Sequence, residues 1–337
     1  MTLKELAGLC GLSVSTVSKA LNNYSDVNEE TRRMVQEKAR EFGYKPNSLA
    51  QNLRSGRTYN IGVLYVDAAE RGLTHSYFSP VLDAFKNEAE SCGYDITFIN
   101  RRFGNREATY LEHCLSRHVD GVCVVCCPFE DPMVVELLNG PIPIVTIDYM
   151  TAKNSCVRSD NAGGMDMIMQ NVLAAGHRRI AMIYGEAAEV TRVRINAFRR
   201  AMDQAGLTIR EDWMVEGEYH NPARTQEVVE KLIAGKDRPT CILMPDDYAA
   251  LGGIEAIRGA GLTVPGDVSV VGYDGVGLLQ RIKPALSTEW QDTETIGREA
   301  ARQLIRQMDN PDSAAPEIVT VPGKFIRGAT LGIIDDD

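Results

Sequence analysis

A short stretch near the N-terminus, "GLSVSTVSKALNN", collects side chains that donate and accept hydrogen bonds. The side chains that would share the exposed side of a helix over residues 14–22 are those of Ser15, Ser18, Lys19 and Asn22. Val17 and Leu21 would lie on the opposite, buried side. Short polar side chains and one cation suit a helix that fills the major groove of DNA, where base edges offer hydrogen bonds. An ordinary solvated helix face is the alternative, and the neighbouring elements decide between the two.

Three helices are expected at this end of the chain. Thr2 and Glu5 form the capping-box pattern for a helix over residues 3–10. Ser13 can cap the second helix, and Asn28 can cap a third one that ends before Gly43. Two short helices around a tight turn, followed by a third, describe a helix-turn-helix module. This arrangement favours DNA recognition.

The distribution of charge supports the same interpretation. The 337 residues carry a net charge of −10, which taken alone argues against a nucleic-acid partner. Residues 1–60 nevertheless hold nine Lys or Arg and six Asp or Glu, a balance of +3, so the remainder carries −13. A basic head on an acidic body predicts an anionic partner for the head only.

The rest of the chain alternates strand and helix patterns. From Ile61 on, runs such as "IGVLYV" and "DGVCVVCC" alternate with amphipathic segments, and the series restarts after "CVRSDNAGG". Two consecutive βα series predict two doubly wound parallel sheets, which bind ligands beyond the carboxyl ends of their strands. A helix over residues 293–308 comes too late for a simple two-lobe chain, so we expect it to return to the first lobe.

Motifs spread over nearly the whole chain share one family resemblance. The head reads "MTLKELAGLCGLSVSTVSKALNN…FGYKPNSLAQNLRSGRTYNIGVL", and the body carries "RHVDGVCVV", "DNAGG", "AAGHRRIAMI", "PDDYAALGGIEAI" and "VPGDVSVVGYD". Together they resemble the lactose-repressor/galactose-repressor family of bacterial transcription regulators. The resemblance implies a ligand-responsive regulator that binds a near-palindromic operator as a homodimer.

The expected fold class combines these inferences. An N-terminal all-α helix-turn-helix head and a hinge helix precede a two-lobed α/β body of the periplasmic-binding-protein type. We expect the head at 1–45, the hinge and linker at 46–60, the first lobe at 61–160 with 290–319, and the second lobe at 161–289 with 320–337.

The family resemblance assigns roles to the polar residues of the head. It implies that Val14 and Ser15 read bases at the start of the recognition helix, with Lys19 near its end. The residues that would bind phosphates and fix the register are Thr16, Ser18, Asn22 and Asn28. Val14 offers only an apolar contact, so the operator sequence cannot be deduced.

The segment "KPNSLAQNLRS" resembles the family's hinge helix, which orders on the operator. Leu53 would then part the central base step in the minor groove. The residues implied to face the groove or the phosphates are Asn47, Ala50, Gln51 and Arg54. A plain linker is the alternative.

The cleft between the lobes should bind the effector. Aromatic rings pack on a sugar or base, whereas carboxylates and a guanidinium bind hydroxyl groups. The candidates, most of them at positions that match the family, are Tyr77, Phe78, Asp148, Arg194, Tyr219, Asp246, Asp274 and Trp290. Asp160 and Asn161 mark the first crossing between the lobes.

One position departs from many relatives. This chain has Asp246-Asp247 where they read Asn-Asp, so an anion replaces a neutral amide. We expect Asp247 to cap the following helix and Asp246 to face the ligand; the alternative is that Asp246 caps that helix and faces solvent. With Arg194 as the main counter-charge, the pocket favours a polyhydroxylated or cationic ligand, such as a sugar, over a sugar acid or a phosphate.

Other classes of function find little support. "GYDGVGLLQ" lacks the third glycine of a dinucleotide loop, and Cys123, Cys126 and Cys127 fit core packing better than metal binding. The histidines, which form no ligand pair, are His75, His113, His118, His177 and His220. We therefore expect no enzyme, no cofactor and no metal.

The remaining expectations concern location, response and assembly. The chain has no apolar run of membrane-spanning length and no export signal, and its cysteines are irregularly spaced, so a cytoplasmic protein with free thiols is expected. A periplasmic-type sugar-binding protein is a weaker alternative, because the chain has a reading head. Release by a sugar-like effector is the default, with co-repression as the alternative. No leucine-heptad tail supports an assembly beyond the dimer.

Overall fold

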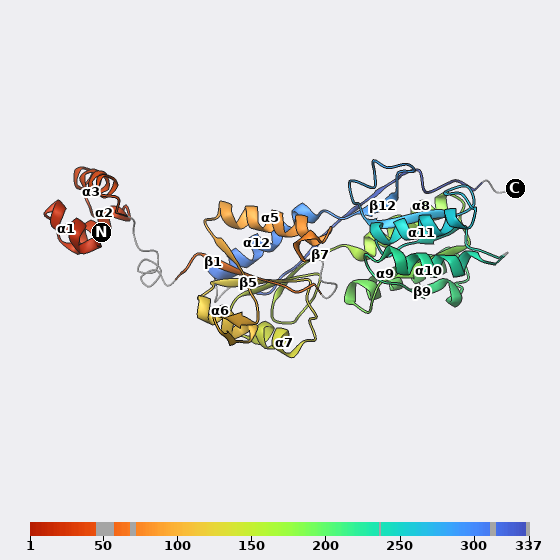
Figure 1. Cartoon of the computed structure of the whole chain (residues 1–337), viewed down its shortest axis with the longest axis horizontal. Coiled ribbons are helices and arrows are strands. Elements are labelled where there is room, and N and C mark those ends of the chain that lie inside the picture. The colour runs from red at the N-terminus through yellow and green to blue at the C-terminus, as the bar shows by residue number, and fades with distance from the viewer. Residues whose placement is uncertain (45–56, 68–71, 236, 311–314, 335–337) are drawn as a thin grey trace. The chain divides into compact units, whose positions relative to one another are not determined.

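The chain divides into two compact units, Met1–Tyr59 and Asn60–Asp337 (Figure 1). The computed structural model describes residues 1–44, 57–67, 72–235, 237–310 and 315–334. The hinge residues singled out above lie outside these ranges; they are Asn47, Ala50, Gln51, Leu53 and Arg54. Each unit is described on its own below.

The first unit is a three-helix head. Its helices are α1 (Leu3–Cys10), α2 (Val14–Leu21) and α3 (Glu29–Glu41). Thr2 and Glu5 close a capping box, Ser13 Oγ accepts from the backbone N–H of Thr16, and Asn28 caps α3. A small core that includes the fully buried Leu6 and Val17 holds the helices together. The helix-turn-helix prediction is confirmed.

The first lobe of the second unit is built on a parallel six-stranded sheet. Its strands run in the order β13-β7-β6-β5-β1-β2, and every neighbouring pair is parallel. Their bounds are β1 (Asn60–Tyr65), β2 (Asp95–Phe98), β5 (Gly121–Val125), β6 (Ile144–Ile147), β7 (Ser155–Ser159) and β13 (Ile318–Val321). A short hairpin, β3 (Arg102–Phe103) and β4 (Arg106–Glu107), lies apart from this sheet.

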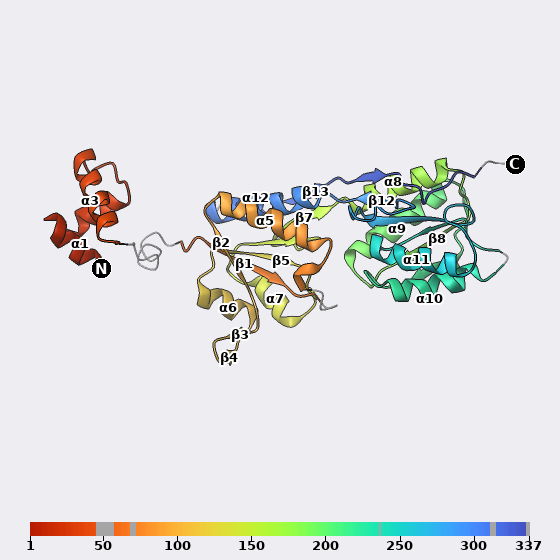
Figure 2. The same ribbon diagram turned by 45° about the horizontal axis from the view of Figure 1, so that its top comes forward.

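Helices cover both faces of this sheet. The helices α5 (Phe78–Ser91) and α12 (Thr293–Asp309) lie side by side in both views of the ribbon and share one core (Figures 1 and 2). The opposite core is formed with α6 (Tyr110–Arg117) and α7 (Pro132–Asn139). The late helix α12 therefore belongs to the first lobe, as expected, although it follows most of the second lobe along the chain.

The second lobe is built on another six-stranded sheet. Its order is β14-β12-β11-β10-β8-β9, parallel throughout except for the β12–β14 pair. The bounds are β8 (Ile180–Tyr184), β9 (Met214–Glu216), β10 (Cys241–Leu243), β11 (Ser269–Asp274), β12 (Ser287–Trp290) and β14 (Lys324–Ile326). The prediction of two doubly wound sheets is confirmed, with β14 as an antiparallel edge strand.

Two helix pairs cover the second sheet. One face packs against α8 (Asn161–Ala174) and α9 (Glu189–Gln204), and the other against α10 (Pro222–Ile233) and α11 (Asp247–Gly259). Short 3-10 turns, η1 (Gly72–Thr74) and η2 (Glu211–Trp213), complete the elements. Among the described residues, no helix is both long enough and apolar enough to cross a membrane.

The chain passes between the lobes three times. The passages follow β7, β12 and β13, and the first and third are joined because Asp160 N–H donates to the carbonyl of Val321 at 2.8 Å. The carboxyl ends of strands from both sheets therefore lie next to these passages, as an open α/β sheet requires of a ligand site.

The close packing of α12 on α5 depends on a glycine. A Cβ at Gly297 would lie 2.2 Å from the carbonyl oxygen of Val81 and 2.8 Å from the nitrogen of Phe85. We predict that Gly297→Ala lowers the free energy of unfolding by about 1–3 kcal/mol, because the helices must separate. Gly259→Ala is the matched control: nothing lies within 4 Å of a Cβ there, so alanine should change stability by less than about 1 kcal/mol. Equal effects in thermal melting would contradict the assigned packing.

Candidate functional site

The exposed face of the head contains the residues singled out from the sequence. Val14 is 44% exposed, and Ser15, Asn22 and Asn28 are exposed as well. Thr16, Ser18 and Lys19 are partly buried, and Lys19 forms an ion pair with Asp26. Two exposed residues, Val14 and Ser15, thus lie at the first turn of α2, where a helix end can approach a partner closely.

Two of these polar side chains also hold the head's own backbone. Asn22 Nδ2 donates to the carbonyl of Ser18 at 2.7 Å, and Asn28 Oδ1 accepts from Thr31 N–H at 2.7 Å. The amide nitrogen of Asn28 is not needed for this cap, so it can still donate to a phosphate. These hydrogen bonds fix the side chains before any partner arrives.

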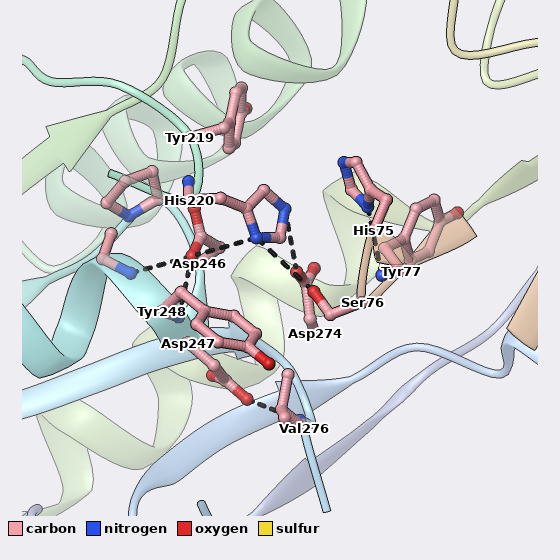
Figure 3. Close-up of polar contacts among 12 residues, drawn as sticks. His75, Ser76, Tyr77, Tyr219, His220, Asp246, Asp247, Tyr248, Asp274 and Val276 are labelled. Carbon is pink, nitrogen blue, oxygen red and sulfur yellow. Dashed lines mark hydrogen bonds and ion pairs between the residues drawn. The ribbon is translucent and has the colours of Figure 1, made fainter. Parts of the chain in front are cut away.

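In the second unit, acidic side chains gather at the carboxyl ends of strands. Asp148 follows β6, Asp246 follows β10, and Asp274 ends β11. The side chains around Asp246 and Asp274, including those of His75 and His220, point toward one another (Figure 3). The acidic site is the name used below for this group of side chains, which consists of Asp148, Asp246, Asp274, His75 and His220 together with Tyr77 and Arg194.

Asp148 and Tyr77 form the first-lobe side of the acidic site. Tyr77 Oη donates to Asp148 Oδ2 at 2.8 Å, and Ser159 N–H donates to Asp148 Oδ1 at 3.1 Å. Burial raises the pKa of Asp148, and these two hydrogen bonds oppose that rise. Burial and the neighbouring Asp148 carboxylate raise the pKa of Tyr77 well above its ordinary value, so its hydroxyl remains a donor. Phe78 packs its ring edge-on to Tyr77, with centroids 4.8 Å apart.

The roles expected for Asp246 and Asp247 are corrected by the structure. Asp246, not Asp247, caps α11: its Oδ1 accepts from the backbone N–H of Tyr248 and Ala249 at 2.8 and 2.9 Å. Its Oδ2 accepts from His220 N–H at 2.6 Å, and the residue is only 1% exposed, so it does not face solvent either. A capping residue needs an extended backbone, and Asp246 has it, with φ −157° and ψ 176°.

Asp247 instead ties α11 to two neighbouring segments. Its carboxylate accepts from Val276 N–H at 2.7 Å and from Thr288 Oγ1 at 2.5 Å, and the side chain is fully buried. Burial raises the pKa of Asp247 to about 7. The residue therefore holds the segment after β11 and the strand β12 in place beside the acidic site.

Asp274 has one oxygen bound to the protein and one directed toward His220. Gln291 Nε2 donates to Oδ1 at 2.7 Å, whereas Oδ2 lies 3.9 Å from His220 Nε2. Burial, with the nearby Asp246 carboxylate as second cause, raises the pKa of Asp274 well above its ordinary value. Burial also raises the pKa of Asp246, against its three backbone hydrogen bonds. The two carboxylates therefore resist being charged together.

Arg194 is the only buried lysine or arginine within the described ranges. Its Nε donates to Asn161 Oδ1 at 2.7 Å and its Nη1 to the carbonyl of Pro245 at 3.0 Å. The guanidinium carbon lies 3.4 Å from the ring centre of Tyr273, a cation–π distance. Arg194 is thus the cation nearest to several buried carboxylates, and two of its nitrogens, Nε and Nη1, donate to neutral groups.

Tyr219 and Trp290 occupy different surroundings. Tyr219 packs its ring on Gly185, where a Cβ would lie 2.1 Å from the ring, and its hydroxyl bonds Thr191 Oγ1 at 2.7 Å. Trp290 lies between Gly275 and Lys324, whose Nζ is 4.4 Å from the ring centre. The register pairs Trp290 with Asp274 on the next strand, so this residue lies beside one of the acids of the site.

The structure brings together residues that the sequence did not mark. The rings of His75 and His220 meet edge to face, with centroids 4.5 Å apart, and Ser76 Oγ lies 3.4 Å from His220 Nδ1. Sequence spacing offers no signal, because 144 residues separate Ser76 from His220. Only the closeness of strand ends in the fold could have suggested the pairing.

Glu289 is a second residue that the sequence did not mark. It is 1% exposed, and neither of its carboxyl oxygens has a hydrogen-bond partner among the described residues. It packs against Gly164 and Gly323, both next to passages between the lobes. Burial raises its pKa to about 8. Alternation along the strand "STEW" could not reveal that this carboxyl is enclosed.

Four of the eight cysteines are buried, and Cys92 is exposed. All eight are free thiols, and Cys123 is fully buried in the first-lobe core. Burial raises the pKa of Cys123 and of Cys127. Within the described residues, no group of three or more His, Cys, Asp or Glu has the arrangement of a metal site.

Two family models match the chain. Residues 2–47 match "Bacterial regulatory proteins, lacI family", and residues 169–331 match "Periplasmic binding protein-like domain". These ranges fall on the head and on the second lobe with part of the first.

Full-length relatives extend the match. The chain is 31% identical over 329 residues to the HTH-type transcriptional repressor PurR of Proteus mirabilis strain HI4320, covering 95% of this chain and 94% of the relative. It is 32% identical over 333 residues to the repressor of the same name from Yersinia pestis strain Pestoides F, covering 97% and 95%. A solved Lac repressor dimer bound to operator and the anti-inducer ONPF superposes with a TM-score of 0.81 at 24% identity, over 98% of this chain and 99% of that one, which supports the fold.

A helix-turn-helix head joined in one chain to a two-lobed body with a polar site at its strand ends defines the class of ligand-responsive, DNA-binding transcriptional regulators. The chain belongs to the LacI family of bacterial regulatory proteins. Its full-length relatives named above are transcriptional repressors, not enzymes.

The enclosed Glu289 carboxyl predicts a pH dependence of stability. Its pKa is about 8 in the folded chain against an ordinary 4.5, so the folded state holds the proton more tightly than the unfolded chain. Stability should therefore fall as the pH rises from about 4.5 to about 8. Glu289→Gln cannot titrate, so its melting temperature should fall less than that of the wild type between pH 5 and pH 8. Glu255→Gln, on the exposed side of α11, controls for the change in net charge. A variant that keeps the full wild-type decline would refute the assignment.

Proposed function

We propose that the chain is a homodimeric transcriptional repressor that binds a near-palindromic operator and releases it when a small effector occupies the acidic site. The observation that carries this proposal is the presence, in one chain, of a head with an exposed polar helix and a body with buried carboxylates at its strand ends. Two-fold symmetry follows because each chain supplies one reading head. The early helices of the first lobe are the proposed dimer contact.

On the DNA side, the head divides its contacts between bases and phosphates. Val14 and Ser15 are proposed to read bases, with Lys19 near the end of the same helix, and the exposure of Val14 and Ser15 supports this. The residues proposed for phosphates are Thr16, Ser18, Asn22 and Asn28. The hinge residues proposed for the minor groove are Asn47, Ala50, Gln51, Leu53 and Arg54, with Leu53 as the wedge.

On the effector side, the site has more acids than bases. The residues proposed to bind or enclose the effector are Tyr77, Phe78, Asp148, Arg194, Tyr219, Asp246, Asp274 and Trp290. Arg194 donates to Asn161 and to the carbonyl of Pro245, and it is the one buried cation that offsets the carboxyl groups of the site among the described residues. An effector with hydroxyl groups or a positive charge complements this environment better than an anion does.

The sheets support the proposed domain boundaries. We propose the head at 1–45, the hinge and linker at 46–60, the first lobe at 61–160 with 290–319, and the second lobe at 161–289 with 320–337. The last proposed boundary, between residues 319 and 320, is supported by the membership of β13 in the first sheet and of β14 in the second.

We propose release by a sugar-like effector in control of carbohydrate use, since a solved structure of the same fold is a regulator in complex with cellobiose. Co-repression is the alternative, and the sign of the effector's action on operator binding decides between them. The proposed regulator has no catalytic role and acts in the cytoplasm, where bacterial DNA lies.

Removal of the head distinguishes the proposed regulator from the alternative, a ligand-binding protein that does not bind DNA. A variant that begins at Asn60 should lose all retardation of DNA in a gel-shift assay, yet keep the effector-induced rise in melting temperature. The DNA is taken from an unbiased oligonucleotide selection with the full chain. A full chain that selects no sequence would contradict the proposal and favour a binding protein.

Point variants of the head refine this test. Lys19→Ala should flatten the dependence of log K on log salt by about 0.9 for each phosphate that the lysine neutralises. Asp26→Asn is the matched control, because it frees Lys19 from its ion pair and should strengthen binding. A loss of sequence preference at unchanged salt slope would assign Lys19 to base reading instead.

A further inference from the structure

The imidazole of His220 lies between two carboxylates of the acidic site. Its Nδ1 is 3.8 Å from Asp246 Oδ1, and its Nε2 is 3.9 Å from Asp274 Oδ2 (Figure 3). The side chains of His220 and Asp274 are each 9% exposed, and that of Asp246 is 1% exposed. The ring therefore fills a position that is nearly closed to water and has a carboxyl group on each of two sides.

Groups from both lobes surround this ring. The His75 ring contacts it edge to face and Ser76 Oγ lies 3.4 Å from Nδ1, and both residues belong to the segment before α5 in the first lobe. Tyr248 of α11 lies with its ring centre 5.8 Å away in the second lobe. The ionisable groups in contact with His220 include Asp246, Asp274, His75 and Tyr248, and the two carboxyl groups lie within ion-pair distance of the ring.

Among the carboxyl oxygens of the acidic site, Asp274 Oδ2 is the one directed at the position of the His220 ring, where a cation could bind. Asp246 uses both oxygens for backbone N–H groups, and Asp148 uses both for Tyr77 and Ser159. Asp274 gives Oδ1 to Gln291, so its Oδ2 is directed at the imidazole. Arg194 is held by Asn161, Pro245 and the Tyr273 ring. A positive group at the place of His220 would satisfy Asp274 and lower the cost of burying two acids together.

The backbone of His220 is anchored independently of its ring. The N–H of His220 donates to Asp246 Oδ2 at 2.6 Å, and φ is +53°, in the left-handed region. Asn221 then caps α10 through Arg224 N–H. Rotation about the side-chain bonds alone can move the imidazole out, because these backbone hydrogen bonds do not depend on the ring.

We propose that His220 is an internal occupant of the acidic site and that the effector displaces it with a positively charged nitrogen. This inference rests on the proposed function, and it narrows the effector class from polyhydroxylated or cationic to one that carries a protonated amine or similar cation. Displacement also separates His220 from His75 and Ser76, so effector binding changes a connection between the lobes.

The proposal can be tested without a known effector. The side chain of His220 is removed by substitution, and imidazole is added to the solution as a free molecule. In His220→Gly, the left-handed backbone suits glycine, and the missing side chain leaves a space between Asp246 and Asp274. At about pH 6, where an imidazole ring is largely protonated, free imidazole should bind that space. At tenfold excess over its Kd, it should raise the melting temperature of the full-length variant by about 3 °C or more, and that of the wild type hardly at all.

Matched controls separate charge from shape. Pyrazole has the size of imidazole but is uncharged at this pH, so it should stabilise His220→Gly much less. The double variant His220→Gly/Asp274→Asn should lose the response to imidazole. If His220→Gly does not fold, His220→Asn, which also tolerates a left-handed backbone, replaces it in the same assay.

Three results would overturn the proposal: equal shifts for wild type and variant, equal shifts with pyrazole and imidazole, or no shift of the variant at all. Because the assay contains no DNA, its failure leaves operator binding untouched. If the variant responds to imidazole but the full chain selects no sequence in the oligonucleotide selection, the proposed function is contradicted and this inference is not.

Discussion

The structure depends on the burial of several carboxylates around one guanidinium. Asp148, Asp246 and Asp274 stand at the carboxyl ends of strands, and Arg194 is the counter-charge buried near them. Burial of like charges is costly, and the pKa of each of these acids is raised as a result. A protein retains such a cluster where a partner compensates it, so the cluster marks the place where ligand free energy can act on the fold. Backbone strain has the same location: φ is positive at Asp148, His220 and Asp274.

The surrounding elements serve to hold these groups in place. The first turn of α11 binds Asp246, Gln291 after β12 binds Asp274, and Ser159 at the end of β7 binds Asp148. Two of these residues, Ser159 and Gln291, lie next to a passage between the lobes. A change at the acidic site therefore acts directly on the segments that connect the lobes, which is the requirement for a two-state response to a ligand. Glu289, whose carboxyl is enclosed beside the same passages with no hydrogen-bond partner among the described residues, adds a group whose surroundings must change if the lobes move.

The sequence predicts the elements better than the contacts between distant side chains. Local patterns predicted the head helices, since Thr2, Ser13 and Asn28 cap them as their residue types suggest. Alternating strand and helix patterns predicted two sheets, because apolar periodicity survives in each element. The cap by Asp246 was only the alternative prediction, since capping depends on one residue's backbone angles and Asp246 and Asp247 have the same side chain. The approach of His75 to His220 was missed because it arises only when strand ends from two sheets meet.

The account's central claim is that the acidic site and the reading head of one chain are coupled. The most direct measurement is the operator Kd of the full-length protein, with and without an extract of bacterial metabolites, for the wild type and for Asp274→Asn. The account predicts that the extract changes the wild-type Kd by about tenfold or more, within the usual range of allosteric coupling, while the variant changes by less than about twofold. An operator Kd that the extract leaves unchanged in the wild type, or changes equally in both proteins, would contradict it.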